Sequence, residues 1–301
     1  MVNFEEIKLS DRKWIVPLLC GVEVESCDNN FTTLFIWRKA YNTKVSTLCG
    51  GKFFSALSQT LENEIPIFTF PYGKGEVKEA LDEIINYCDN KNITPVFYSI
   101  TDKNRLILDE LYKGKFSYEE MPDSFDYIYE TEKLANLKGK KLAAKRNHIN
   151  AFLAENKDWK YEEIDKSNID EAYELSQKWC SLHKCAVGKT AKEDCCAVRE
   201  AFDSYFDLEL SGGLIRTKGE VVAYSMGDYL SDRIFDVHIE KAMPDVRGAY
   251  QIINREFVRN CCNQFEFVNR EDDAGSENLR KAKLSYHPFK ILKKYKAIYN
   301  G

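Results

Sequence analysis

Long hydrophobic runs are absent from this chain of 301 residues. The longest uncharged apolar stretch, residues 14–22, is less than half of the roughly 20 residues that a membrane-spanning helix needs. The first residues, Met-Val-Asn-Phe-Glu-Glu, also lack the basic start and apolar run of a secretory signal. The sequence therefore predicts no transmembrane span and a cytoplasmic location, with contact to a membrane surface left open.

Metal-binding spacings are also missing. The four histidines are scattered, and none of the ten cysteines forms a Cys-x-x-Cys pair. A chain of this size needs no disulfides in order to fold, so we interpret the cysteines as reduced and mostly buried thiols. Covalent catalysis by Cys185 near His183 is a minor alternative, because no motif arranges that pair. We expect no metal and no bound cofactor.

Glycine and proline are scarce, with 15 and 7 residues, and 44% of the chain is hydrophobic. The length suits two domains of roughly 150 residues. A net charge of −5 argues against a broadly basic surface for nucleic acid. Basic residues are nevertheless concentrated in residues 138–146 and in residues 278–301, where no acidic residue occurs. We therefore expect a polyanionic partner to dock locally.

An internal duplication is the most informative pattern. Residues 71–88 and 244–261 align without a gap, which matches Gly75 with Gly248. Each segment predicts a helix with a 3.6-residue apolar period between two apolar strands. We place these strands at residues 65–70 and 95–100 in the first half, and at 233–239 and 265–268 in the second. The halves therefore carry the same strand–glycine turn–helix–strand unit.

Upstream of the second unit, residues 170–182 predict a helix, and a Lys218-Gly219 turn predicts a hairpin. The order helix, hairpin, strand, glycine turn, helix, strand resembles the GNAT acyltransferase fold, and its repetition indicates a tandem GNAT protein. The expected class is α/β (α+β), with a mixed central sheet flanked by helices in each domain. We expect an N-terminal domain over residues 1–157 and a C-terminal domain, with the active site, over residues 158–301.

The glycine turn before each helix exposes backbone N–H groups at the positive end of a helix dipole. Arg247 and Gly248 are therefore candidates for binding a phosphate or an oxyanion, although an ordinary strand-to-helix turn has the same sequence features. GNAT members that bind coenzyme A typically have Gln or Arg three residues before the glycine and Gly or Ala two residues after it. Asp245 and Tyr250 occupy those places here. Acetyl-CoA is therefore the less favoured donor.

Two longer stretches, residues 126–152 and 268–288, together with Phe31–Trp37, resemble the phosphatidylglycerol lysyltransferase C-terminal domain family, especially its stand-alone members. The resemblance implies a tandem GNAT fold. Relatives of known activity transfer an aminoacyl group from aminoacyl-tRNA to a lipid head-group hydroxyl, and the related Fem peptidyltransferases transfer it to a peptidoglycan-precursor amine. The lysyltransferases proper also carry a membrane-embedded N-terminal part, and this sequence shows none.

The expected function is transfer of an aminoacyl group from aminoacyl-tRNA to a hydroxyl or amine acceptor, which is a lipid head group or a small molecule. An activated ester already carries a good leaving group, so this transfer needs no enzyme nucleophile. Two alternatives stay open: an acetyl-CoA-dependent N-acetyltransferase, and a non-catalytic module that binds a tRNA end or an anion.

The first family stretch supplies two candidate binding residues. Arg146 falls on the same helical stripe as Leu142 and Ile149, so we expect it to point inward. There it would grip a phosphate or carboxylate of the substrate, or form a structural ion pair. Lys145, with its basic neighbours, suits a tRNA backbone, although a basic helix face is more often simply solvated.

The second family stretch supplies the candidate catalytic residues. A positioned carboxylate of Glu271 or Asp272 would orient or deprotonate the acceptor, while Asp273 would cap a helix beginning near residue 276. Lys283 shares a helical face with Leu279 and Tyr286, so it would stabilise an oxyanion, hold a phosphate or extend along the surface. Arg280 and Tyr286 complete the expected substrate-binding residues.

Overall fold

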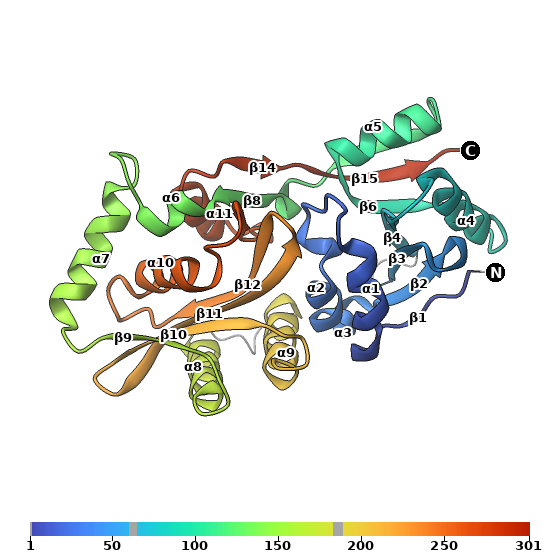
Figure 1. Ribbon diagram of the computed structural model, residues 1–301. Coiled ribbons are helices and arrows are strands. Elements are labelled where there is room, and N and C mark those ends of the chain that lie inside the picture. The colour runs from blue at the N-terminus through green and yellow to red at the C-terminus, as the bar shows by residue number, and fades with distance from the viewer. Residues whose placement is uncertain (1, 60–64, 183–188) are drawn as a thin grey trace. The chain divides into compact units, whose positions relative to one another are not determined.

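The computed structural model describes residues 2–59, 65–182 and 189–301 (Figure 1). The chain forms two compact units, each assembled from separated segments. Unit 1 comprises Met1–Asp126, Asp272–Ser276 and Ile291–Gly301, and unit 2 comprises Tyr127–Glu271 and Glu277–Lys290. Each unit contains one mixed sheet flanked by helices, which confirms the expected α/β class.

Sheet 1 has the strand order β1-β2-β3-β4-β6-β15-β7, and the short β5 also pairs with β3. Only the pairing of β4 with β6 is parallel among its described strand pairs. The strands are β1 (Glu5–Glu6), β2 (Lys44–Leu48), β3 (Phe53–Ser58), β4 (Ile67–Thr69), β5 (Tyr72–Gly73), β6 (Val96–Thr101), β7 (Phe116–Glu120) and β15 (Lys294–Tyr299).

The helices of unit 1 are α1 (Arg12–Leu19), α2 (Phe31–Ile36), α3 (Arg38–Tyr41), α4 (Val77–Asp89) and α5 (Asp102–Leu111). The buried face of α4 follows the predicted 3.6-residue period, with Ala80, Leu81, Ile84, Ile85 and Cys88 in the core. Helix α5 begins with a capping box in which Thr101 and Asn104 satisfy each other's backbone N–H groups.

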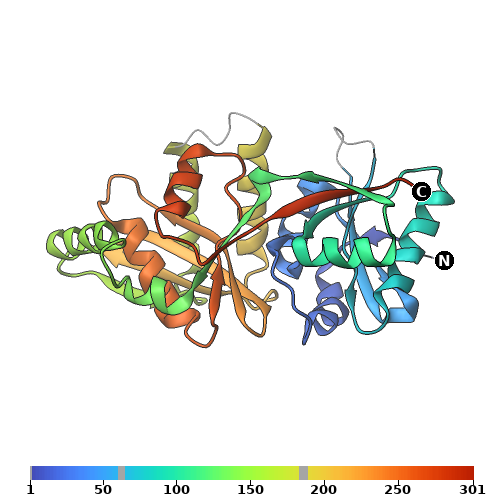
Figure 2. The ribbon, with the colours of Figure 1, turned by 90° about the horizontal axis from the view of Figure 1, so that it is seen from above.

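Sheet 2 has the order β14-β8-β13-β12-β11-β10-β9, and its one described parallel pair is β12 with β13. Figures 1 and 2 show α8 and α9 on one side of this sheet and α10 and α11 on the other. The strands are β8 (Asp126–Glu130), β9 (Lys160–Glu163), β10 (Ser211–Thr217), β11 (Glu220–Ser231), β12 (Ile234–Ala242), β13 (Phe267–Asn269) and β14 (Lys290–Leu292). The helices are α6 (Thr131–Asn136), α7 (Ala143–Glu155), α8 (Ile169–Leu182), α9 (Lys189–Asp203), α10 (Ala249–Cys261) and α11 (Glu277–Leu284).

The predicted duplication corresponds to the two parallel modules, β4–α4–β6 in unit 1 and β12–α10–β13 in unit 2. The aligned glycines both precede the module's helix and both have a positive φ, 133° at Gly75 and 81° at Gly248. Because the apolar periods of these modules are contiguous in the sequence, local patterning was sufficient to predict them.

Next to each parallel pair, a strand from a distant part of the chain enters the sheet. Strand β15, drawn in red, lies between β6 and β7 in sheet 1, and β8, drawn in green, lies between β13 and β14 in sheet 2 (Figure 1). The units therefore divide at Asp126 and not at the expected residue 157, because β8 pairs with β13 and α7 packs on α10.

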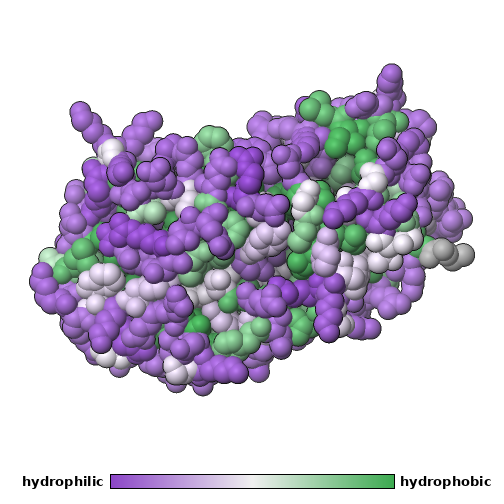
Figure 3. All heavy atoms as spheres, in the orientation of Figure 1, coloured by the Kyte–Doolittle hydropathy of each residue, from purple (hydrophilic) through white to green (hydrophobic). Residues whose placement is uncertain are grey.

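The face of the molecule in Figure 3 is mostly hydrophilic, with hydrophobic side chains in small separate groups. Among the helices of the described ranges, none has both the length and the apolar character needed to cross a membrane.

Candidate functional site

The candidate site lies in unit 2, where strands β12 and β13 separate. Their parallel pairing covers only three residue pairs and ends at Asp236 and Asn269. Strand β12 then continues to Ala242, whereas the chain after Asn269 leaves the sheet through Glu271, a non-glycine residue with a left-handed φ of 56°. Beyond the last pair, the two segments are connected by side chains in place of backbone hydrogen bonds.

A β-bulge places His238 at this opening. Opposite β12, consecutive residues Met226 and Gly227 of β11 pair with Ile239 and Val237, so His238 is the extra residue. Gly227 is required here, because a Cβ atom on it would lie 2.0 Å from the backbone oxygen of Asp236. Bulges commonly redirect a side chain near a functional site, and this one turns the imidazole toward the loop that follows β13.

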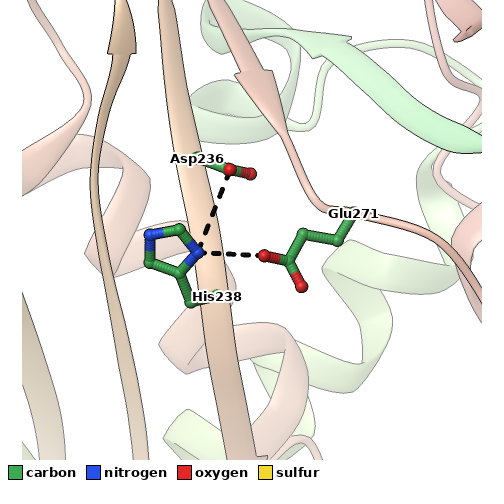
Figure 4. A group of neighbouring side chains, drawn as sticks. All are labelled: Asp236, His238 and Glu271. Carbon is green, nitrogen blue, oxygen red and sulfur yellow. Dashed lines mark hydrogen bonds and ion pairs between the residues drawn. The ribbon is translucent and has the colours of Figure 1, made fainter. Parts of the chain in front are cut away.

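Each ring nitrogen of His238 faces a carboxylate, and Figure 4 shows the one from Glu271. Its Nδ1 is 2.9 Å from Oε1 of Glu271, and its Nε2 is 2.8 Å from Oδ1 of Asp228. Burial disfavours the charged ring, but the carboxylates of Asp228 and Glu271 outweigh burial and raise the pKa of His238 well above 6.5. The imidazolium therefore donates from both nitrogens and fixes the Glu271 carboxylate, whose side chain keeps 21% of its surface exposed.

Asp236, His238 and Glu271 could also be considered as metal ligands, because one donor atom of each lies within 4.8 Å of the others. Both ring nitrogens of His238 face carboxylates, however, and each lies within hydrogen-bond distance of one. The three side chains therefore fit a group of hydrogen-bonded ion pairs better than a metal centre.

Arg270, which precedes Glu271, bridges the same opening one step further along β12. Its Nη2 donates to Oε1 of Glu240 at 2.8 Å, and both side chains are about nine-tenths buried. The guanidinium carbon lies 5.0 Å from the ring centroid of Tyr286 and 5.8 Å from that of Tyr129. These contacts hold the guanidinium between an acid and two aromatic faces.

Two lysines complete what we call the basic cluster, defined as Lys145, Arg270 and Lys283. The Nζ atom of Lys145 lies 4.1 Å from the centroid of Tyr286, and that of Lys283 donates to the backbone oxygen of Arg270 at 2.6 Å. Tyr129 donates its hydroxyl proton to the backbone oxygen of Lys283. Burial, followed by repulsion from Arg270, lowers the pKa of Lys145. The cluster therefore gathers three basic side chains around Arg270, the residue before Glu271.

On the two side chains that bond to Glu240, two polar atoms have no hydrogen-bond partner among the described residues. They are Nη1 of Arg270 and Oδ1 of Asn254, and both atoms are buried. The amide nitrogen of Asn254 donates to Glu240, which leaves its oxygen as an acceptor. A buried donor without an acceptor is costly, so the guanidinium edge is suited to an added anionic oxygen.

The structure brings together four of the residues that we expected from the sequence: Lys145, Glu271, Lys283 and Tyr286. Lys283 points inward, as expected, but Leu279 on the expected shared face is 48% exposed. Tyr286 is buried and lies beyond the end of α11 at Leu284.

Three other expected binding residues contact other parts of the protein. Arg146 points inward, but its Nη1 donates to the backbone oxygens of Leu137 and Gly139, at 2.7 Å for Gly139, where we expected a phosphate or a carboxylate. Arg247 is exposed and lies 3.7 Å from Glu155. A Cβ atom on Gly248 would lie 2.3 Å from the backbone oxygen of His148, so this glycine allows α7 to pack against the start of α10.

The remaining candidates lie along the second family stretch. Asp272 and Asp273 accept hydrogen bonds from the backbone of Ala274 and Gly275. Asp273 is fully buried, and its described bond supports the loop, whereas α11 begins later, at Glu277. Arg280 is half-buried on α11. Cys185 and His183 lie outside the described residues.

The sequence analysis missed His238, Arg270 and Glu240. One signal was present, because the polar residues Asp236, His238 and Glu240 alternate in the sequence with the apolar residues Val237 and Ile239. Gly227 inside an apolar strand also indicates a bulge.

Several solved structures are similar to this chain. A conserved protein of unknown function from Bacteroides thetaiotaomicron is 33% identical, with a TM-score of 0.94, over 99% of this chain and 100% of that one. The C-terminal domain of a putative lysylphosphatidylglycerol synthetase from Agrobacterium fabrum has a TM-score of 0.71 at 15% identity, covering 97% of this chain and 92% of that one. The lysylphosphatidylglycerol synthetase of Bacillus licheniformis has a TM-score of 0.63 at 12% identity, covering 93% and 94%.

A curated relative, an uncharacterised protein of Mycoplasmoides gallisepticum, is 27% identical over 193 residues. This alignment covers 62% of the present chain and 60% of the relative's own length. The family model for the C-terminal domain of phosphatidylglycerol lysyltransferase matches residues 21–298, which is nearly the whole chain. The chain therefore belongs to the phosphatidylglycerol lysyltransferase C-terminal family.

Proposed function

We propose that this protein is an aminoacyltransferase, which moves an aminoacyl group from aminoacyl-tRNA to a hydroxyl or amine acceptor at the opening between β12 and β13. The observation that carries the proposal is the basic cluster beside Glu271, with a buried Arg270 Nη1 that lacks an acceptor. Family membership supports an acyltransferase-like domain, and the site chemistry supports an anionic substrate.

Each part of the site has a role in this reaction. Arg270 and Lys145 would bind a phosphate, either of the tRNA acceptor end or of the acceptor's head group. Lys283 would then stabilise negative charge on the ester carbonyl oxygen as the acceptor attacks. Tyr286 would hold the two long basic side chains in place through its ring.

Glu271 would act on the acceptor. The acceptor oxygen or nitrogen forms a bond to the ester carbon, the bond from that carbon to the ribose oxygen breaks, and one proton passes from the acceptor to the ribose. Glu271 would accept that proton and return it to the leaving oxygen. His238 is a positioning residue, because its bond to Oε1 leaves Oε2 directed to the acceptor.

The test is a transfer assay with tRNA charged with labelled amino acids, incubated with the protein and a mixture of lipids and small metabolites. We expect label to appear on a lipid or amine above the level without enzyme. Glu271→Gln should lower the transfer rate about 100-fold, the lower end of general acid–base effects. The matched control is Glu266→Gln, because Glu266 is exposed and pairs with Arg233 on the surface.

Two outcomes would contradict the proposal. No movement of label, with unchanged hydrolysis of the charged tRNA, would favour an acetyl-CoA donor or a binding-only protein. Equal transfer by the Glu271→Gln and Glu266→Gln variants would remove Glu271 from the reaction.

A further inference from the structure

Two thiols on the far side of sheet 2 from α10 lie unusually close. Cys180 is near the end of α8 and Cys195 is in α9, and their Sγ atoms are 2.7 Å apart. Carbon atoms in ordinary contact are ~3.5–4.0 Å apart and sulfur is larger, whereas a disulfide bond measures about 2.05 Å. Both residues are half-buried. The two side chains therefore point at each other from packed helices, and small molecules can reach them.

Neighbouring contacts hold both thiols in position. Trp179, beside Cys180, donates from Nε1 to the hydroxyl of Tyr250 on α10 at 3.0 Å. Asp194, beside Cys195, accepts from Nζ of Lys241 at 2.9 Å, and the same Nζ lies 4.2 Å from the centroid of Trp179. Lys241, on β12, is only 5% exposed. Its contacts with Trp179 and Asp194 connect the two helices next to the two cysteines.

We propose that Cys180 and Cys195 are a redox modification site and form a reversible disulfide that joins α8 to α9. The oxidant is a small-molecule disulfide such as oxidised glutathione. One cysteine thiolate attacks it, forming a mixed disulfide and releasing one thiol, and the second thiolate then displaces the other thiol. Two S–H bonds and the oxidant's S–S bond break, one protein S–S bond forms, and two molecules of small thiol are released.

The bond would enclose the chain between Cys180 and Cys195 in a covalent ring and fix the two helices against Lys241. Closing a loop of this size restricts the unfolded chain, so we expect the oxidised protein to melt about 5 °C higher than the reduced protein. This inference is independent of aminoacyl transfer, because it concerns helices on the other side of sheet 2.

The test uses the full chain in buffers of oxidised and reduced glutathione, followed by an acid quench, alkylation, digestion and mass spectrometry. We expect a linked peptide containing Cys180 and Cys195, which dithiothreitol cleaves, and a melting temperature that falls back on reduction. Cys180→Ser and Cys195→Ser should each abolish the link and the melting shift. Cys196→Ser is the matched control, because Cys196 is the exposed neighbour of Cys195 and should leave both unchanged.

Full alkylation of both thiols in the oxidised wild-type protein would overturn the proposal, as would a link from either cysteine to Cys185 or Cys196. The wild-type measurement needs no variant, so a variant that folds poorly does not affect this conclusion.

Discussion

The two parallel modules have the same topology but use the space beyond the last strand pair in different ways. In unit 1, the pairing of β4 with β6 ends at Thr69 and Tyr98, and Ser99 follows with a left-handed φ of 55°. In unit 2, Glu271 has nearly the same φ shortly after the pairing of β12 with β13 ends. Both modules therefore turn the chain away at corresponding places, and the difference lies in the side chains.

In unit 1, a closed ion-pair network fills this space. Lys294 of β15 has no exposed surface and lies 2.5 Å from Asp28 and 2.7 Å from Asp126. Ser99 donates its hydroxyl proton to Asp28. Burial opposes charge on both partners, but their attraction raises the pKa of Lys294 well above 10.5 and lowers that of Asp28 below 3.8. These charged side chains therefore satisfy one another within unit 1.

In unit 2, the corresponding space is closed incompletely. Glu271 stays partly exposed, and the edge of Arg270 lacks an acceptor. One copy of the duplicated module therefore pairs its buried charges with one another, while the other leaves Glu271 partly exposed and Nη1 of Arg270 without an acceptor. This contrast is why we place the proposed reaction in unit 2.

Removing the central charge of unit 1 should have the largest effect on stability. Lys294→Met leaves Asp28 and Asp126 without their buried partner, and losing one member of a buried pair costs about 3–5 kcal/mol. The free energy of unfolding in urea measures this loss. Lys293→Met is the matched control, because Lys293 forms an exposed pair with Glu120, worth at most about 1 kcal/mol. Similar losses in the two variants would mean that the network does not hold β15.

The aligned glycines offer a smaller test of the comparison. Gly248→Ala combines a left-handed φ with a Cβ atom 2.3 Å from the backbone of His148, whereas the nearest atom at Gly75 is a side-chain carbon of Phe53 at 3.4 Å. The positive φ strains an alanine at both sites, by roughly 1–2 kcal/mol for left-handed backbone, and the collision with backbone adds to it only at Gly248. We expect Gly248→Ala to destabilise the protein more than Gly75→Ala in thermal unfolding. The reverse order would mean that α7 can move away from α10.

The smallest expected effect is on the pH dependence of stability, which should have opposite directions at the two charged sites. The pKa of His238 is raised in the folded protein. Its contribution to stability is therefore complete below pH 6.5 and is lost as the pH rises through the folded pKa. The pKa of Asp28 is lowered in the folded protein. Its contribution to stability is therefore complete above pH 3.8 and is lost as the pH falls through the folded pKa. Each unit of pKa shift corresponds to about 1.4 kcal/mol.

The measurement is urea unfolding across pH, with His238→Gln as the comparison. This variant should lose the alkaline decline in stability and keep the acid decline. An alkaline decline of unchanged size in His238→Gln would assign it to another group.

The sequence predicted the parts of the fold that depend on neighbouring residues. The parallel modules have contiguous apolar periods, so their helices and strands were found close to their observed bounds. The boundary between the units was not predicted at its observed place. Strands β8 and β15 each pair with strands far away in the sequence, and no local pattern encodes that pairing.

The site shows the same limit. Lys145, Glu271, Lys283 and Tyr286 were chosen as candidates because they lie in stretches of distinctive sequence. His238 depends on a one-residue bulge, and Arg270 depends on where β13 stops pairing, so tertiary structure determines both roles. Arg146 was expected to bind a phosphate or a carboxylate, but its partners are backbone oxygens, which carry no sequence signal.

The position of β15 in sheet 1 affects the order in which the chain can fold during synthesis. Most of unit 1 is made first, yet its sheet lacks the strand between β6 and β7 until residues 291–301 have emerged. Until then, Asp28 and Asp126 have no lysine partner from β15, and two strands keep unpaired edges of the kind that promotes aggregation. Unit 1 therefore cannot complete its sheet until the segments of unit 2 have been synthesised.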